Sequence, residues 1–152
     1  MEISKLVEVA VAERYAKKFK RAFFTVHGYF KDFDVGSLTG DVSLEVKMDT
    51  YSTSSGNVAV EYSYKGEPSG AAASTADSFV FVIPEGKDLH LMAYEVDARD
   101  LKAVLSKVGF VRGGDNYFST MKLLSVERLK EIASDSFSIE LNLGKLKEYW
   151  KR

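Results

Sequence analysis

Hydrophobic and polar residues recur with two different periods along this chain of 152 residues, and the change of period separates helices from strands. Residues 4–22 hold no Gly or Pro and are dominated by good helix formers, which predicts a long first helix. At 100° per residue, one stripe of this helix collects the apolar side chains of Val9, Ala12, Tyr15, Ala16, Phe19 and Phe23. Glu8 falls near the middle of the stripe and Glu13 near its edge. The opposite side carries Lys17, Lys18 and Arg21.

Beyond residue 22 the period shortens toward two, as it does in strands. Strands are expected over residues 23–30, 33–38, 41–48, 58–64, 78–83, 89–96 and 116–122. The polar residues 50–57 predict a loop, and the Ala-rich residues 71–77 are a short helical candidate. Further helices are expected over residues 98–108, 126–133 and 143–152, the first two with the N-caps Asp97 and Ser125. This order of elements predicts a single α/β domain over residues 1–152, with helices around one mixed sheet.

A two-residue turn at Thr39-Gly40 would bring two carboxylates face to face, because Gly tolerates the positive φ that such turns need. Asp34 then lies directly opposite Glu45, and opposed side chains have Cβ atoms about 5 Å apart. Two carboxylates at that separation repel each other unless a cation lies between them. Lys47 follows Glu45 by two residues and points to the same face. A pair of acids beside an ammonium group indicates a metal-dependent site that cleaves phosphodiester bonds.

Glu8 adds a third acid, because an acid at the centre of an apolar helical face must be desolvated or find a partner. We expect Asp34 and Glu45 to hold Mg²⁺, with the main-chain carbonyl of Val46 as a further ligand. Lys47 would position the attacking water or stabilise charge on the phosphate. Glu8 would bind a water or a second metal ion. The reserve acids for the same site are Asp49 and Glu61.

The composition narrows the choice of metal. The chain has no cysteines, and its two histidines, His27 and His90, lie far apart. This excludes disulfides, thiolate-bound zinc and iron–sulfur clusters, and it disfavours an imidazole-based metal site. A site built from oxygen ligands suits Mg²⁺ or Mn²⁺. No apolar run approaches the length of a membrane span and the first residues show no signal sequence, so a cytoplasmic protein is expected.

Charge is distributed unevenly, although the net charge is only −1. Residues 1–31 contain seven Lys/Arg and three Glu, residues 32–100 four Lys/Arg and thirteen Asp/Glu, and residues 101–152 ten Lys/Arg and six Asp/Glu. Basic ends around an acidic middle permit DNA binding if the acids gather at a metal site. The candidates for phosphate contacts are Lys17, Lys18, Arg21, Lys145, Lys147 and Lys151, with the hydroxyls of Ser69 and Thr75. The alternative is a normally mixed surface.

Asp34 followed by Glu45-Val46-Lys47, after a helix with an inward Glu8, resembles the motif of the PD-(D/E)XK nuclease superfamily. The motif covers about residues 8–49, and Phe33 stands where the superfamily name has Pro. A longer stretch is similar to small virus- and phage-encoded members, over residues 45–49, 56–61, 66–70 and 75–77. The size of the chain is similar to that of archaeal-type Holliday junction resolvases.

The resemblance implies a restriction-endonuclease-like core, in which helices flank a mixed sheet, and cleavage of DNA with Mg²⁺ or Mn²⁺. It implies metal binding by Asp34 and Glu45, a catalytic Lys47 and an assisting Glu8. It also implies a homodimer that acts on branched DNA in recombination. The alternatives are a single-strand, flap or restriction-like nuclease and a noncatalytic DNA-binding domain. Spacing alone is also compatible with a solvent-facing charged ladder on a hairpin.

Overall fold

The computed structural model describes residues 3–26, 32–86 and 90–141. Its strands are β1 (Phe23–Thr25), β2 (Val35–Ser37), β3 (Ser43–Met48), β4 (Asn57–Tyr64), β5 (Glu67–Pro68), β6 (Ser78–Glu85), β7 (His90–Asp97), β8 (Val111–Gly113), β9 (Ser119–Ser125) and β10 (Asp135–Ile139). Its α-helices are α1 (Ile3–Phe19), α2 (Ser52–Ser55), α3 (Ala98–Leu105) and α4 (Val126–Ile132). Short 3₁₀ segments lie at Gly70–Ala72 and Asp115–Tyr117.

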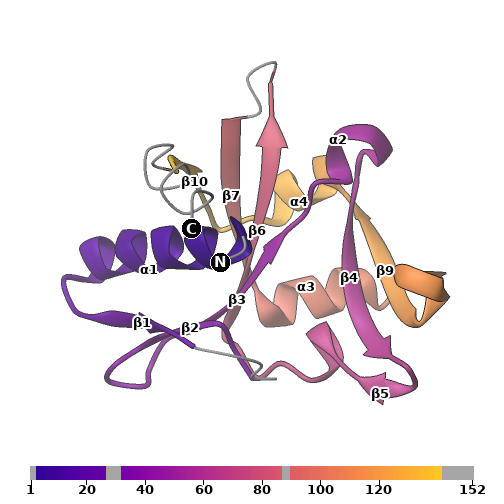
Figure 1. The fold of residues 1–152 in the computed structure, drawn as a ribbon, viewed down its shortest axis with the longest axis horizontal. Coiled ribbons are helices and arrows are strands. Elements are labelled where there is room, and N and C mark those ends of the chain that lie inside the picture. The colour runs from indigo at the N-terminus through magenta and orange to yellow at the C-terminus, as the bar shows by residue number, and fades with distance from the viewer. Residues whose placement is uncertain (1–2, 27–31, 87–89, 142–152) are drawn as a thin grey trace, which may run out of the picture.

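These strands form two sheets (Figure 1). The larger sheet has six strands in the order β1-β2-β3-β6-β7-β10, and the smaller has four in the order β5-β4-β9-β8. The larger sheet is mixed, because β3 and β6 run parallel while the other neighbouring strands are antiparallel. The α/β class with a mixed sheet and flanking helices is therefore confirmed. The prediction of one sheet is wrong, because β4, β5, β8 and β9 pair only with each other among the described strands.

Strand β6 separates two hydrophobic cores on opposite faces of the larger sheet. Phe79, Phe81 and Ile83 belong to the first core, which also contains residues of β4, β9, α3 and α4. Val80 and Val82 belong to the second core, which contains the buried residues of α1. Figure 1 shows α1 on one side of the central strands and α3 with the smaller sheet on the other. Burial on both faces explains why the sequence of β6 reads as a continuous apolar run.

Helix α1 presents a buried face that is rotated from the predicted stripe. Ala12 and Tyr15 are buried as expected, but the other buried residues are Val7, Glu8 and Val11. Val9 is 40% exposed and Phe19 is 42% exposed. The sequence left this phase ambiguous because apolar residues occur on both sides of the helix, and packing against the second core selected one of them. Glu8 lies on the buried face, as expected.

The N-caps expected for the two later helices are confirmed. The side chain of Asp97 accepts a hydrogen bond from the Arg99 amide at 2.8 Å, and that of Ser125 accepts one from Arg128 at 3.1 Å. Both contacts satisfy an amide that has no partner within its own helix. No helix in the described ranges is long and apolar enough to cross a bilayer.

The β2–β3 hairpin has the register that the Thr39-Gly40 turn predicts. Val35 pairs with Leu44 and Gly36 with Ser43, and the amide of Asp34, one residue before β2, donates to the Leu44 carbonyl. Gly40 has a φ of 78°, in the left-handed region that favours glycine. The hairpin therefore brings the Asp34 carboxylate next to Glu45, although Asp34 itself lies just outside the paired residues.

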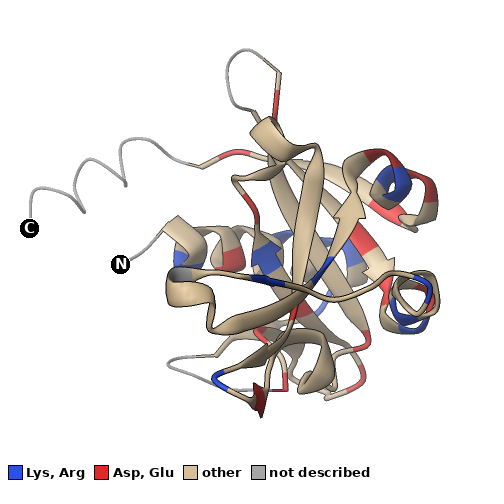
Figure 2. Ribbon diagram, turned by 90° about the vertical axis from the view of Figure 1, so that its right-hand side faces the viewer, with Lys and Arg blue, Asp and Glu red and all other residues tan. Residues whose placement is uncertain are grey.

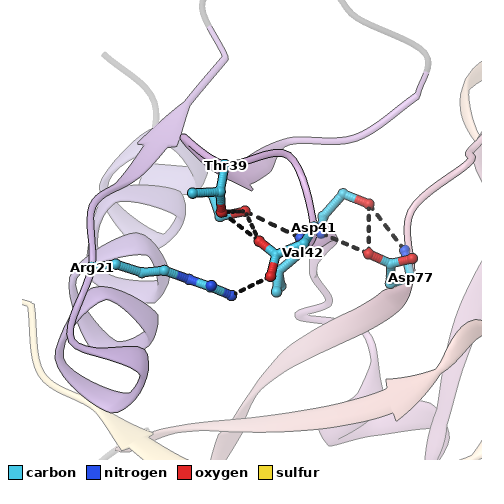
Figure 3. Close-up of polar contacts among 7 residues, drawn as sticks. Arg21, Thr39, Asp41, Val42 and Asp77 are labelled. Atoms are coloured by element: carbon cyan, nitrogen blue, oxygen red, sulfur yellow. Dashed lines mark hydrogen bonds and ion pairs between the residues drawn. The ribbon is translucent and has the colours of Figure 1, made fainter.

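Polar contacts hold the tip of this hairpin from two sides (Figure 3). The guanidinium of Arg21 contacts Asp41 at 2.8 Å, and the hydroxyls of Thr39 and Ser37 donate to the same carboxylate. These hydroxyl contacts lower the pKa of Asp41 to about 2. On the other side, Asp77 accepts hydrogen bonds from the amide and hydroxyl of Ser43, at 3.0 and 3.3 Å. The hairpin is thus anchored to the end of α1 and to the segment before β6.

Two segments differ from their predictions because hydrogen bonds of their main-chain amides decide their conformations. Residues 50–57, expected as a loop, contain α2, which begins where Asp49 accepts hydrogen bonds from the Tyr51 and Ser52 amides. Residues 71–77, expected as a helix, form only a 3₁₀ turn over Gly70–Ala72. Thr75 and Asp77 instead donate their amides to the carbonyls of Asp32 and Ser43, at 3.0 Å each.

Other boundaries also change. The strand expected over 116–122 begins at Ser119, and β6 continues through Pro84 to Glu85. Strands β8 and β10 were not predicted, although Phe137 and Ile139 of β10 alternate with polar residues and are buried. Of the strand expected over 23–30, β1 covers Phe23–Thr25 and Val26 lies beyond its end, while residues 27–30 and the helix expected over 143–152 lie outside the described residues.

Candidate active site

The candidate site lies at the edge of β3, where β2 stops pairing with it. The Asp34 amide donates to the Leu44 carbonyl at 2.9 Å, and its carboxylate Oδ2 accepts from the Val46 amide at 2.8 Å. The N–H and C=O of one residue in an extended strand face the same neighbour. The Val46 carbonyl therefore points toward Asp34 as well. A carboxylate and a main-chain oxygen are thus placed together at this edge.

Glu45 lies next to Asp34 in an environment that disfavours its charge. Burial, the negative charge of Asp34 and that of Glu8 raise the pKa of Glu45 to about 8, while an interaction with the Ser74 hydroxyl opposes the rise. Oxygen Oε2 of Glu45 is buried and has no hydrogen-bond partner among the described residues. Burial also raises the pKa of Asp34, against the opposing effect of the Val46 amide. Too little positive charge therefore lies near Asp34 and Glu45 to balance the negative charges of both carboxylates.

Glu8 approaches the same pair from α1. Its exposed fraction is 7%, and burial together with the charge of Asp34 raises its pKa. Lys5, one turn earlier in the helix, contacts the Glu8 carboxylate at 3.0 Å and also donates to the Val26 carbonyl at 3.3 Å. Glu13 is exposed. The structure thus brings Glu8, and not Glu13, to the two hairpin acids.

Lys47 lies on the face of β3 that Glu45 occupies, and it is exposed. The two residues line a cavity of about 170 Å³ with Glu61, Ser69, Gly70 and Phe81. The ammonium group is thus available to a ligand that enters beside Glu45. We call this space the catalytic cavity, after the roles that the sequence predicts for Glu45 and Lys47.

Glu61 forms the opposite wall of the catalytic cavity from β4. Its carboxylate accepts hydrogen bonds from the Ser69 hydroxyl at 2.9 Å and from the Ser119 hydroxyl at 2.6 Å. Gly70 packs so closely that a Cβ on it would lie 2.3 Å from the Glu61 carbonyl oxygen. Its φ of 51° also favours glycine. The segment after β5 therefore closes the cavity by pressing on β4.

Asp49, the other reserve acid, stabilises the local fold through hydrogen bonds to main-chain amides. It is 4% exposed, and its carboxylate accepts the amides of Tyr51, Ser52 and Ala59 at 2.9, 3.1 and 2.9 Å. These contacts begin α2 and join it to β4. Its oxygens are consequently engaged away from Asp34 and Glu45.

The predicted phosphate contacts are not gathered at one place. Ser69 lines the catalytic cavity, whereas Thr75 lies in a separate surface depression with Asp77 and Lys102. Lys18 contacts Asp135 at 3.1 Å and Arg21 contacts Asp41 at 2.8 Å. Lys17 is exposed. Lys145, Lys147 and Lys151 lie outside the described residues.

Sequence reasoning missed Lys5 and Ser74, which both act on the site acids. The signal for Lys5 was its spacing of three residues from Glu8, which places the two side chains on one helix face. The Ser74 hydroxyl donates to the Asp32 carbonyl at 2.8 Å and accepts from the Ala76 amide at 3.1 Å. That placement depends on contacts between segments about forty residues apart, so the local sequence carried no signal for it.

The residues present are compatible with one magnesium ion. In the described ranges, no cluster of three or more His, Asp or Glu side chains is arranged to hold a metal. Mg²⁺ is commonly bound by only one or two carboxylates, with waters and substrate phosphate completing its octahedron. Asp34, Glu45 and the Val46 carbonyl supply that many oxygens, and the partnerless Oε2 of Glu45 is suited to a cation.

Charge around the site is mixed. Figure 2 shows Lys and Arg interspersed with Asp and Glu over the described elements. Local geometry at the site, and not a single charged face, therefore has to account for recognition of any ligand.

No protein-family model matches the chain, and a comparison with curated proteins finds no match.

Proposed function

We propose that the protein is a Mg²⁺-dependent endodeoxyribonuclease that cuts branched DNA as a homodimer. The proposal is carried by the convergence of Asp34 and Glu45 at the open edge of β3, where Oε2 of Glu45 is buried without a partner. A buried acceptor left unpaired is unfavourable, and a cation at this edge would remove the penalty. Lys47 and Glu8 stand next to this pair from two different elements.

Each residue has a role in phosphodiester hydrolysis that follows from its position. Asp34, Glu45 and the Val46 carbonyl would hold the metal ion, which supplies a water of lowered pKa and polarises the phosphate when bound. Lys47 can contact the same phosphate and stabilise the negative charge that develops on it. Glu8 can hydrogen-bond a water of the site and accept its proton.

The choice of branched DNA and of a dimer rests on the resemblance of the chain in size and single-domain build to archaeal-type Holliday junction resolvases. A dimer would present two sites for paired cuts in opposing strands. A chain of 152 residues is also small for enclosing a duplex alone. A nuclease for single strands or flaps would use the same residues on another substrate.

The test is incubation of the full chain with matched linear, flap and four-way-junction DNA, in Mg²⁺ or in EDTA. We expect cleavage in Mg²⁺ only and fastest cleavage of the junction. Cleavage of the flap alone would support the flap nuclease instead. Binding without cleavage of any substrate would support a noncatalytic DNA-binding domain and contradict the nuclease.

Substitutions of Asp34, Glu45, Lys47 and Glu8 test whether the cleavage activity depends on these residues. Asp34→Asn and Glu45→Gln should abolish cleavage, because each removes a metal ligand while keeping a similar shape. Lys47→Ala should lower the rate roughly 100- to 1,000-fold, the usual effect of losing one group that stabilises transition-state charge. Glu8→Gln should reduce cleavage, whereas Glu13→Gln on the exposed face of α1 should not. Full activity of Glu45→Gln would exclude the proposed site.

A further inference from the structure

A second depression continues from the catalytic cavity along the smaller sheet. It has a volume of about 570 Å³ and shares Lys47, Ala59 and Glu61 with that cavity. We call it the distal groove and define it by Lys47, Tyr51, Asn57, Glu61, Met121 and Leu123. Pockets of roughly 300–1,000 Å³ are typical of small-ligand sites. A strand whose phosphate lies at Lys47 would therefore extend one neighbouring nucleotide into the distal groove.

The charges of the distal groove favour a neutral occupant. Lys47 and Glu61 stand at the end shared with the catalytic cavity, and Asp49 belongs to the wall beyond them. A phosphate placed deeper in the groove would face these two carboxylates. Each oxygen of Glu61 accepts one serine hydroxyl, from Ser69 or Ser119, and a carboxylate oxygen can accept a second donor. A neutral group that donates hydrogen bonds is therefore preferred.

The remaining surface suits a flat aromatic ligand. Met121 and Leu123 supply apolar surface from β9, and Leu123 is 38% exposed. Methionine side chains are polarisable and adapt their shape to aromatic rings. Tyr51, which is 78% exposed, also lines the groove and can stack on a ring. Apolar surface, an aromatic ring and hydrogen-bond acceptors together match a nucleobase.

We propose that the distal groove binds one unpaired nucleobase of the strand whose phosphate lies at Lys47. This inference rests on the proposed nuclease function and specifies its substrate. A base must leave its duplex partner to enter such a pocket. The enzyme would accordingly select phosphates that are flanked by an unpaired nucleotide, as at branch points, flaps and single strands.

The four methionines of the chain provide a direct test. Met48 and Met121 line the distal groove, whereas Met92 lies on β7 against the first core. We would label methionine methyl groups with ¹³C, assign them with Met48→Leu and Met121→Leu, and titrate the full chain with single-stranded pentadeoxyadenylate in Ca²⁺. The matched ligand is a pentamer of abasic deoxyribose phosphates. We expect the Met121 signal to move with the first ligand only, while Met92 stays unchanged. Met48 also packs against the second core, so its methyl signal is a weaker reporter of the groove.

Equal movement of the groove methyls with both ligands, or no movement with either, would overturn the inference. The measurement does not depend on cleavage. Base-dependent shifts in a protein that cuts no DNA would support the groove while contradicting the nuclease. Cleavage without such shifts would leave the nuclease and exclude the groove.

A pair of tyrosine variants supplies the second arm. Tyr51→Ala should weaken binding of pentadeoxyadenylate about 5- to 100-fold, as expected for the loss of one base-stacking side chain. Tyr117→Ala is the matched control, because Tyr117 is 69% exposed and does not line the groove. The Tyr117→Ala variant should bind as the unchanged protein does. Equal losses in both variants, or none in either, would contradict stacking on Tyr51.

Discussion

At the scale of single residues, Glu45 is the group on which the site depends. Its Oε2 atom is buried without a partner, and burial beside Asp34 raises its pKa to about 8. In the unfolded chain the same group has an ordinary pKa of 4.5. Folding therefore favours the protonated form, and the metal-free protein carries an electrostatic penalty once this group ionises.

This difference in pKa predicts how stability changes with pH. Between the unfolded pKa of 4.5 and the folded pKa of about 8, the folded state binds the extra proton. The free energy of unfolding must fall as pH rises through that window, by about 1.4 kcal/mol for each pH step of one. In EDTA, we expect urea unfolding to show lower stability at pH 8 than at pH 5. Glu45→Gln should remove most of that loss, since an amide cannot ionise.

The control for this measurement is Glu67→Gln, because Glu67 is an exposed glutamate on β5. It should keep the pH dependence of the unchanged protein. A pH profile that is the same in Glu45→Gln and Glu67→Gln would show that Glu45 does not cause the pH dependence. Mg²⁺ should act in the opposite direction and stabilise the protein most at pH 8, since it binds the ionised carboxylates.

At the scale of elements, the site depends on how two short segments press against β3 and β4. The β2–β3 hairpin is anchored at its tip by Asp41 and Asp77, which holds Asp34 and Glu45 in register. The turn at Gly70 closes the catalytic cavity over Glu61. Both segments also bury apolar side chains, Val35 and Leu44 in the second core and Ala71 in the first, so core packing adds to these contacts.

A pair of glycine variants tests the role of the closing turn. Gly70 and Gly66 both have positive φ, at 51° and 81°. A Cβ on Gly70 would collide with the Glu61 carbonyl, whereas one on Gly66 would meet nothing within 4 Å. Gly66→Ala should therefore lose only about 1–2 kcal/mol from its backbone conformation. Gly70→Ala should lose clearly more and lower cleavage, as measured by urea unfolding and the nuclease assay. Similar losses in the two variants would mean that the close approach is unimportant.

At the scale of the whole molecule, positive and negative charges are interspersed, and local ion pairs engage some basic residues in α1 and just after it. Lys18 contacts Asp135 and Arg21 contacts Asp41. Affinity for DNA should consequently depend on a metal ion that first neutralises the negative charges of Asp34, Glu45 and Glu8. The proposed dimer would add a second copy of the same surface.

We therefore predict that Ca²⁺ tightens DNA binding without cleavage, and that the affinity falls as salt increases because phosphate contacts release counterions. In Ca²⁺ a four-way junction should bind more tightly than a linear duplex of equal length. The mass in solution should be that of a dimer. A monomeric mass together with equal affinities for both DNAs would exclude the resolvase-like function and leave a general nuclease.

Local sequence alone determined the elements whose signals are short-range. The Gly40 turn and the period of two set the hairpin register that brings Asp34 near Glu45, and Asp97 and Ser125 began their helices as N-caps. Each of these features needs only residues that lie close together in the chain. The absence of cysteine likewise limited any metal site to oxygen ligands or to histidine.

Tertiary structure decided the features that join distant segments. The phase of α1, the second sheet, and the packing of Gly70 on Glu61 all depend on contacts between parts of the chain that carry no local signal for each other. The same is true of Ser74 beside Glu45 and of the groove between β3 and the smaller sheet. Burial and hydrogen bonding across such distances outweigh local propensity, because a segment adopts the conformation that satisfies its amides and buries its apolar surface in the assembled fold.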